Sequence, residues 1–456
     1  MKQQDKGGIP GPPDENRPVT LFSAVIIVIA NMIGIGVFTT LGFQVAGVHS
    51  PFAILMLWVL GAVGAFCGAL CYGELGAMMP RSGGEYTYLS QIYHPAIGFL
   101  SGWVSMVAGF AAPIALAAIA LGEYAGAILP GLDKTVVAVS VIVILSLVHL
   151  ANVRFGCHFQ NLVTVGKIFL IVAFIVLGFL ATNPQDITLT PSPSDWGSVF
   201  SPAFAISLVY VFYAYSGWNS ASYVAGEIFR PEKNLPIALF WGAAFVALCY
   251  CLINYVFLYT VPMSELAGQI DVGYLSAKSI FGPRGAAIMT VLICVALISS
   301  LSSLIMVGPR VTQTMSEDLD RLRFLATRNR SGAPVYAIIL QALVAIFLTL
   351  TATFNAVLTY VGFTLALFAS LAVLGVFVLR RRHPNLNRPF RTWGYPVTPA
   401  IFLLLYGWMI VYLIIERPLP SLFGLLTVAS GLLLYKLLAP ARPPSSLEKM
   451  VDKSIS

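Results

Sequence analysis

Charged side chains are scarce in this sequence, and their scarcity excludes a water-soluble globular protein. Asp, Glu, Lys and Arg together make up 10% of the 456 residues, whereas 58% of the residues are hydrophobic. So few charged side chains could not cover so large an apolar fraction in water. The surrounding solvent must therefore be lipid.

Cysteine and histidine are also few, with six and five residues. The cysteines lie in or beside apolar runs and not in the expected outer loops, which argues against a disulfide framework. No Cys/His cluster has the spacing of metal ligands, so we expect no metal centre and no cofactor. The acidic residues fall near the ends of apolar runs or in loops. This placement disfavours an intramembrane enzyme, and the lack of a repeated filter or charge ring disfavours a channel.

Apolar runs recur along nearly the whole chain. A helix needs roughly 20 apolar residues to cross a ~30 Å hydrocarbon core, and we count about twelve runs of suitable length, which predicts an all-α integral membrane fold. The polar N-terminus, rich in Pro and Gly, does not have the pattern of a cleavable signal peptide. The expected spans are 19–42, 52–79, 86–121, 136–153, 158–181, 202–226, 235–261, 285–315, 335–353, 355–379, 397–415 and 419–438.

The positive charges are unevenly divided between the two sets of loops. With an even number of spans and the N-terminus inside, the inner loops hold most of the Lys and Arg residues, including the run 380–382, and the outer loops hold Lys134, Lys278, Arg284 and Arg417. The positive-inside rule then predicts a cell-membrane protein with both termini cytoplasmic. The net charge of +7 is explained by this topology and needs no nucleic acid partner.

Two spans, the first and the sixth, carry glycine near their middle. The segments are Met32, Ile33, Gly34, Ile35 and Gly36 in the first, and Tyr213, Ala214, Tyr215, Ser216, Gly217, Trp218 and Asn219 in the sixth. Glycine tolerates backbone angles that unwind a helix and leave N–H and C=O groups without their partners. Matching interruptions of this kind point to an inverted-repeat transporter with a midplane site.

Such a break suits a zwitterion, because a helix half that starts presents N–H groups and one that stops presents carbonyls. A carboxylate fits the first and an ammonium the second, so a small amino acid is the expected ligand. The alternative is that these glycines only allow close helix packing. The occurrence of two breaks in matching positions, together with the aromatic residues Tyr213, Tyr215 and Trp218, favours a binding site.

Lys167 is a second candidate, since it lies well inside the fifth span. A lysine at membrane depth costs at least ~2.5 kcal/mol on insertion scales, so it marks a functional site by default. The alternative is a lysine that snorkels to the surface. The eighth span offers hydroxyl partners for an ammonium, although small residues there could equally serve helix packing. These hydroxyls belong to Ser299, Ser300, Ser302 and Ser303.

With these residues the chain resembles the amino acid–polyamine–organocation (APC) superfamily, and within it the L-type amino acid transporters. The resemblance covers about residues 18 to 440. It rests on four segments in order, namely Met32 to Phe38, Pro80-Arg81-Ser82-Gly83-Gly84-Glu85-Tyr86, Tyr213 to Asn219, and Pro231-Glu232-Lys233-Asn234-Leu235-Pro236. We interpret the Gly83-Gly84 pair and Glu85 as a turn and a helix start.

The resemblance implies a leucine-transporter-like fold of two inverted five-helix repeats followed by two further helices, with helices 1 and 6 unwound. The corresponding parts are a cytoplasmic tail (1–18), the repeats (19–181 and 202–382), helices 11 and 12 (397–438) and a second tail (439–456).

The resemblance also implies residue roles. The substrate carboxylate would meet the amides of Ile35 and Gly36. The ammonium of the substrate would meet the carbonyls of Met32, Tyr213 and Ser216. Tyr213 would also be an aromatic gate, with Asn219 nearby. Lys167 matches a lysine that, in sodium-independent members, places its ammonium where sodium-coupled relatives bind an ion.

Two features depart from the family pattern. The residue between the helix-one glycines is commonly small and polar, but here it is Ile35, which narrows the pocket. The outer loop from Leu121 to Thr135 has no cysteine, so we expect no covalently linked partner subunit.

The expected function is sodium-independent exchange of neutral L-amino acids by alternating access, an antiporter activity. Proton-coupled symport is the alternative, because a buried ammonium can titrate near neutral pH. Charged substrates are not expected, since no acidic residue is apparent at the depth of the breaks.

Overall fold

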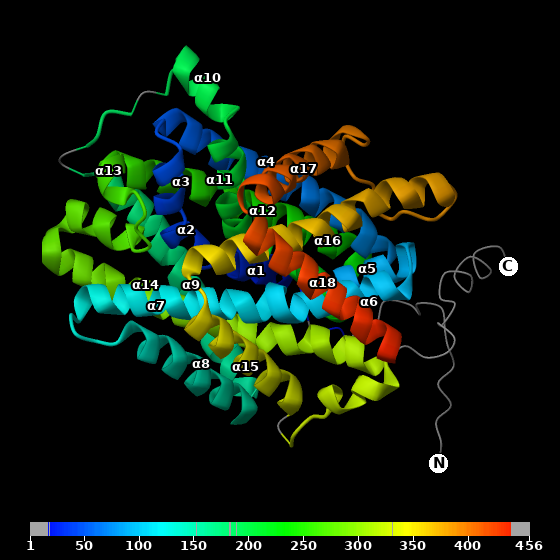
Figure 1. Cartoon of the computed structure of the whole chain (residues 1–456). Helices are drawn as coiled ribbons and strands as arrows, with labels where there is room; N and C mark the ends of the chain where they lie inside the picture. Colours follow the sequence, from blue (N-terminus) through cyan, green and yellow to red (C-terminus); the bar gives the residue numbers. More distant parts are fainter. Residues whose placement is uncertain are drawn as a thin grey trace.

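The computed structural model describes residues 17, 19–151, 153–181, 184–187, 189–330 and 332–438, without the side chains of 153–163 and 320. The expected tails at 1–16 and 439–456 lie outside the described residues. Helices account for most of the described part, in which the β-structure consists of two isolated bridges. The all-α class is confirmed (Figure 1).

The helices follow one another with short connections. They are α1 (Leu21–Met32), α2 (Gly36–Thr39), α3 (Leu41–Gly47), α4 (Pro51–Met78), α5 (Glu85–Ile92), α6 (Pro95–Val104), the π-helix η1 (Ser105–Ala111), α7 (Ala112–Ile128), α8 (Lys134–Ala151), α9 (Val153–Gly178), α10 (Pro193–Val199), α11 (Pro202–Ala214), the 3₁₀-helix η2 (Ser220–Glu227), α12 (Pro231–Thr260), α13 (Met263–Leu266), α14 (Val272–Glu317), the 3₁₀-helix η3 (Asp320–Ala326), α15 (Val335–Thr351), α16 (Phe354–Arg382), α17 (Val397–Glu416) and α18 (Pro418–Leu438).

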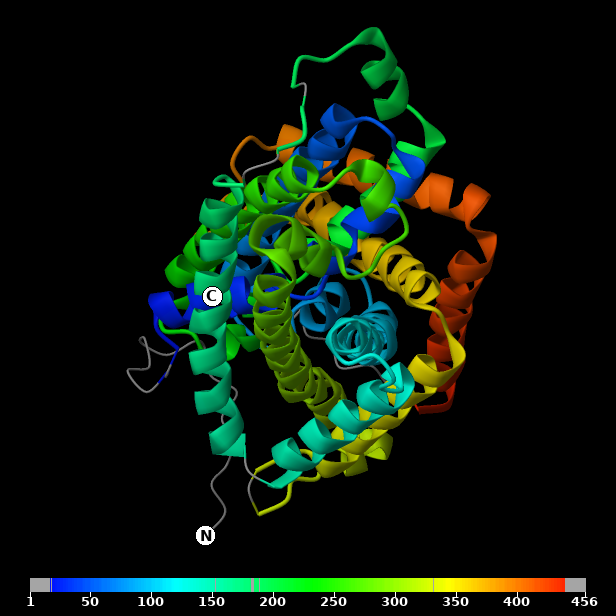
Figure 2. The same cartoon turned by 90° about the vertical axis from the view of Figure 1, so that its left-hand side faces the viewer.

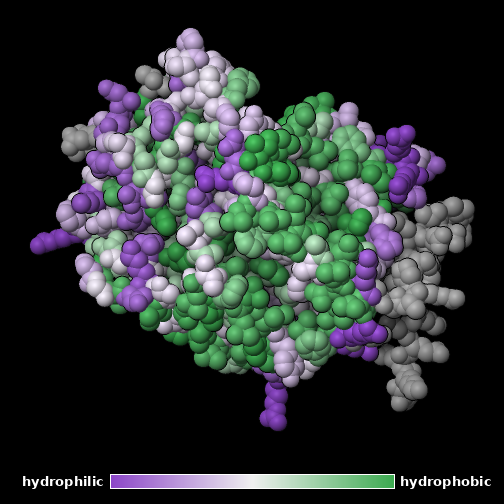
Figure 3. All heavy atoms as spheres, in the orientation of Figure 1, coloured by the Kyte–Doolittle hydropathy of each residue, from purple (hydrophilic) through white to green (hydrophobic). Residues whose placement is uncertain are grey.

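The described residues form nine helical segments that are long and apolar enough to cross a membrane, or ten if the bent pair of α10 and α11 counts as one span. Two shorter apolar helices, Thr164–Gly178 and Val335–Thr351, lie where we expect the fifth and ninth spans. Twelve spans therefore remain a prediction. In Figure 3, apolar side chains form a band between two more polar margins, as expected for a surface that faces lipid.

The helices α6, η1 and α7 form one continuous segment, Pro95–Ile128, that runs through the bundle and is seen almost end-on in Figure 2. Its α7 part packs against α8, α14 and α15, whereas α12 packs against both α1 and α4. The helix α11 lies against α4, α16 and α17. The end of α1 and the end of α11 approach each other and hold the candidate site.

The two ends of the bundle have different contacts. We call one end the Val19 face and define it by Val19, Ser82 and Ile228. There the Val19 N–H donates to the carbonyl of Glu227 at 3.1 Å. On the Gly42 face, the segment after α12 covers α3, and the Gly268 N–H donates to the Gly42 carbonyl at 2.9 Å. A Cβ at Gly42 would lie 2.1 Å from the Gln269 carbonyl oxygen, so only glycine fits there.

An ion-paired carboxylate ties α4 to the end of α16 and to the segment that follows it. Glu74, which is 1% exposed, accepts hydrogen bonds from Arg380 at 2.6 and 3.0 Å. It also accepts from the Thr392 N–H at 2.7 Å, and Arg388 lies 3.5 Å away. Removing one partner of a buried pair leaves an uncompensated charge, which makes Glu74 a structural anchor.

We predict that Glu74→Gln lowers stability, because the two arginines then lose their counter-charge. Breaking a buried pair costs about 3–5 kcal/mol. The melting temperature of the purified protein in detergent should fall clearly below that of wild type. The exposed Glu265 supplies a matched control, Glu265→Gln, which should melt as wild type does. Equal melting of both variants would contradict the anchoring role.

Candidate functional site

The first membrane helix is interrupted at residues 33–35. Regular helix ends at Met32 and begins again at Gly36. The Met32 carbonyl accepts hydrogen bonds from the Gly34 N–H at 2.8 Å and from the Tyr250 hydroxyl at 2.6 Å. Among the described residues, the N–H groups of Ile35 and Gly36 have no hydrogen-bond partner. This break therefore exposes donors, whereas the Met32 carbonyl already uses both of its lone pairs.

A second interruption follows Ala214, where α11 ends. Residues 215–219 form turns, and η2 begins at Ser220. Gly217 has φ +95°, a conformation that side-chain-bearing residues rarely adopt. The Tyr213 carbonyl accepts a hydrogen bond from the Ser216 N–H at 3.0 Å. The carbonyl of Ser216 accepts none from the described backbone, so it remains available to a ligand.

The two breaks contact each other through their glycines. A Cβ on Gly36 would lie 2.5 Å from the Cα of Ala214, and a Cβ on Gly217 would lie 2.8 Å from the carbonyl carbon of Asn31. At Gly34 the nearest atom would be 3.8 Å away, an ordinary contact. Gly36 and Gly217 are thus required for space, while Gly34 is not.

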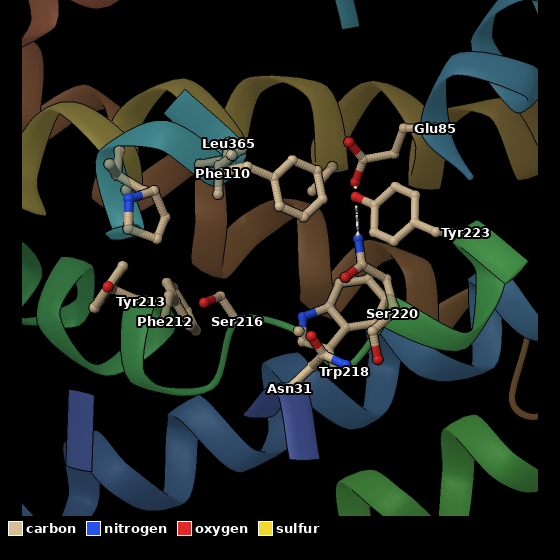
Figure 4. A pocket seen from close by; sticks show the side chains of 18 of the residues that line it. Asn31, Glu85, Phe110, Phe212, Tyr213, Ser216, Trp218, Ser220, Tyr223 and Leu365 are labelled. Carbon is tan, nitrogen blue, oxygen red and sulfur yellow. Dashed lines mark hydrogen bonds between the residues drawn. The ribbon is translucent and has the colours of Figure 1, made fainter. Parts of the chain in front are cut away.

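Two adjoining cavities lie at the breaks and share Asn31, Tyr213 and Ser216. The smaller cavity, about 60 Å³, reaches the backbone of the first helix, and its lining includes Gly34, Ile35, Gly36, Ala214, Ser300 and Ser303. The larger cavity is about 120 Å³, and its lining includes Glu85, Phe110, Gly217, Trp218, Asn219 and Tyr223. Figure 4 shows Tyr213 and Phe212 at one end of this cavity, Glu85 and Tyr223 at the other, and Phe110 between them.

Ten of the twelve residues expected to bind the substrate line one of these cavities. Two do not. Ile33 is fully buried in the apolar core, and the hydroxyl of Tyr215 donates to the Trp58 carbonyl at 3.1 Å, so that its ring lies against α4 and α12. Both positions follow from the turn of the backbone at the breaks, which points neighbouring side chains in opposite directions.

Lys167 lies between α1 and α14. It is 2% exposed, and its Nζ donates to the Ala30 carbonyl and to the Ser300 hydroxyl, each at 3.2 Å. The Ala30 carbonyl precedes the break by only a few residues. The lysine therefore places a positive charge directly behind the smaller cavity, which Ala30 and Ser300 also line.

The four serines of α14 point in different directions. Ser300 contacts Lys167, and Ser303 donates to the Asn31 side chain at 3.5 Å. Ser302 hydrogen-bonds His149 of α8 at 2.9 Å, on another side of the helix. Ser299 is buried. Of the four, Ser300 is thus the one with a hydrogen bond to the lysine among the described contacts.

Several cavity residues were not expected from the sequence, above all Asn31 and Glu85. Asn31 stands immediately before Met32, so its place beside the break was a usable signal. Glu85 was interpreted as a helix start, and it does begin α5, yet its side chain lines the larger cavity. The positive φ of Gly83 and Gly84 turns the chain there and brings Gly84 against the ring of Tyr223. The premise that no acidic residue reaches the site was wrong.

Comparison with known protein families shows to which family the chain belongs. The sequence model described as amino acid permease matches residues 19–433, nearly the whole described chain. The chain belongs to the amino acid permease family. Its helical architecture agrees with this assignment, and the protein is a multi-pass membrane transporter of amino acids and not an enzyme.

The chain is also similar to named transporters along most of its length. It is 29% identical to the human b(0,+)-type amino acid transporter 1, over 92% of this chain and 87% of that protein. It is 25% identical to the mouse Asc-type amino acid transporter 1 and to the mouse large neutral amino acids transporter small subunit 2, over 92% of this chain and 80% of each relative. The APC-type resemblance stated from the sequence is thereby confirmed.

We predict that Gly36→Val weakens amino acid binding by this permease, because the added atoms overlap Ala214. Overpacking costs about 1–3 kcal/mol, which corresponds to roughly a five- to 150-fold weaker affinity if the cost falls on the ligand-bound state. Ligand-induced thermal stabilisation of purified protein measures this loss. Gly407 of α17 has open space around it, so Gly407→Val is the matched control. Equal ligand responses in both variants would contradict the role of the break.

We predict that Lys167→Ala reduces amino acid uptake to a small fraction of wild type and leaves folded protein. The substitution removes the positive charge behind the break and both of its hydrogen bonds. Uptake into proteoliposomes and the elution profile in detergent are the two measurements. The exposed Lys278 gives the control Lys278→Ala, for which uptake should be unchanged. Wild-type uptake by Lys167→Ala would remove the lysine from the mechanism.

Proposed function

We propose that this permease is a sodium-independent exchanger of neutral L-amino acids. The observation that carries the proposal is the position of Lys167. Its ammonium is held by a backbone carbonyl and a hydroxyl between α1 and α14, the kinds of oxygen that hold a coupling ion beside an interrupted helix in this class of transporter. A fixed ammonium there replaces a mobile sodium ion, so transport has no sodium gradient to use.

The smaller cavity suits the α-carboxylate and the α-ammonium of the substrate. The free N–H groups of Ile35 and Gly36 provide donors for the carboxylate. The Ser216 carbonyl and the Asn31 side-chain oxygen provide acceptors for the ammonium. The Met32 and Tyr213 carbonyls contribute less, since each already accepts hydrogen bonds from the protein.

Tyr213 lines both cavities, and this position supports a role as the aromatic gate. The helices that carry the breaks, α1 with α2 and α11 with η2, would rock together with α4 and α12 against the group of α7, α8, α14 and α15. Alternating access of this kind exposes one central site to each side of the membrane in turn. The division into two inverted repeats, 19–181 and 202–382, is part of the same proposal.

The orientation follows from the charges at the two ends of the bundle. Arg81, Arg310 and Arg380 lie towards the Val19 face, where they pair with Asp318, Glu227 and Glu74. An excess of arginine marks the cytoplasmic side. We therefore place the Val19 face and both termini in the cytoplasm and the protein in the cell membrane. Because the loop between α7 and α8 has no cysteine, we expect transport without a covalently linked subunit.

Exchange can be tested with purified protein in liposomes. We predict that uptake of labelled L-leucine is stimulated several-fold by unlabelled leucine inside, is the same in sodium and potassium buffers, and is not driven by an imposed pH gradient. Liposomes without protein give the background. A requirement for sodium would overturn the assignment of Lys167. Uptake that follows the pH gradient without stimulation from inside would instead favour proton-coupled symport.

A further inference from the structure

The larger cavity contains a carboxylate that the proposed exchange of neutral substrates does not use. Glu85 is 4% exposed and lies at the end of the cavity opposite Tyr213 (Figure 4). Its Oε1 accepts hydrogen bonds from the Tyr72 hydroxyl at 2.6 Å and from the Asn219 side-chain N–H at 3.0 Å. Its Oε2 has no partner among the described residues. One oxygen is thus fixed, and the other is left for a ligand.

No cation among the described residues pairs with Glu85. Glu74, the other buried carboxylate in the described part, is held by Arg380 and Arg388. An ionised carboxylate taken out of water is costly unless it is paired. The difference between the two acids is that Glu85 faces a cavity, so a ligand can supply the cation that the protein does not.

The size of the cavity fits this assignment. About 120 Å³ is several times the roughly 10–15 Å³ that one water-sized group needs, so the larger cavity has room for a chain of several non-hydrogen atoms. The side chain of lysine or arginine fits within this volume. The adjoining cavity of about 60 Å³ has room for the amino acid backbone, which stays at the breaks.

The walls of the larger cavity suit a long side chain with a charged end. Phe110, Trp218, Leu365 and Tyr406 line it with apolar surface, against which methylene groups can pack. Aromatic faces also attract a nearby cation. Polar groups lie at both ends: Asn31 and Ser216 at the breaks, and Tyr223 and Asn219 beside Glu85 at the far end. The cavity is apolar along its length and anionic at its end.

We propose that this cavity is a side-chain subsite for cationic amino acids, with the terminal ammonium or guanidinium of lysine or arginine bound to Oε2 of Glu85. This inference rests on the proposed function, because it places the substrate backbone at the breaks. It adds a substrate class and a specificity-determining residue. Neutral amino acids with long apolar side chains occupy the same cavity without using the carboxylate.

The test is competition against exchange of labelled L-leucine in proteoliposomes. Lysine and arginine are compared with norleucine, which has a similar stem but no charge. For wild type, all three should inhibit. In Glu85→Gln, the concentration of lysine or arginine needed for half inhibition should rise at least about tenfold, as expected for loss of a hydrogen bond to a charged group. Norleucine should inhibit as before, and Glu85→Asp should restore part of the lysine effect.

Other outcomes separate the possible failures. If wild type exchanges leucine but lysine and arginine do not inhibit, the cationic subsite is wrong and the exchanger stands. Equal weakening of lysine and norleucine in Glu85→Gln, measured also as thermal stabilisation of the purified protein, would make Glu85 a structural residue only. The exposed control Glu265→Gln should behave as wild type. If wild type exchanges no amino acid, the proposed function itself fails.

Discussion

The structure depends on the direct contact between two interrupted helices. Gly36 packs on Ala214 and Gly217 packs on Asn31, so each break is held open by the backbone of the other. In a bilayer, unpaired backbone groups are tolerated only where protein or a wet cavity receives them. The paired breaks meet this condition for each other, and the N–H groups that remain free face a shared cavity. A binding site and a close helix contact are here the same feature, so the two interpretations of these glycines are not alternatives.

Lys167 gives this arrangement its electrostatic character. The lysine approaches the Ala30 carbonyl, two residues before the end of α1. The carbonyls at the end of a helix carry partial negative charge, which the ammonium offsets without a dissolved ion. Its second partner, Ser300, belongs to α14, a helix of the opposite group. The lysine therefore bridges two groups of helices that alternating access would move relative to each other, and its hydrogen bonds are suited to respond to that movement.

Much of this could be predicted from the sequence, because membrane helices impose strong constraints. Scarce charge and long apolar runs indicate the fold class, and paired glycines locate the breaks. A lysine in an apolar run stands out by its cost alone. The direction in which an individual side chain points could not be predicted, since at a break it depends on how far the helix unwinds. Tyr215 and Ser302 lie on the expected helices but point to Trp58 and His149. Periodicity cannot predict the position of Tyr215, because the backbone there is no longer helical. For Ser302, which lies in regular helix, it cannot predict which neighbouring helix covers that side of α14.

Glu85 shows the other limit of the sequence analysis. Its distance along the chain from the breaks suggests a position at the membrane boundary, and Glu74 stands in a similar place near the end of α4. The two carboxylates nevertheless differ, since arginines from α16 and the segment after it reach Glu74, while the turn at Gly83 and Gly84 directs Glu85 inward. Whether a buried acid anchors the fold or faces a ligand depends on which distant residue contacts it. In this permease, an arginine at one acid and a cavity at the other separate a structural residue from one available for recognition.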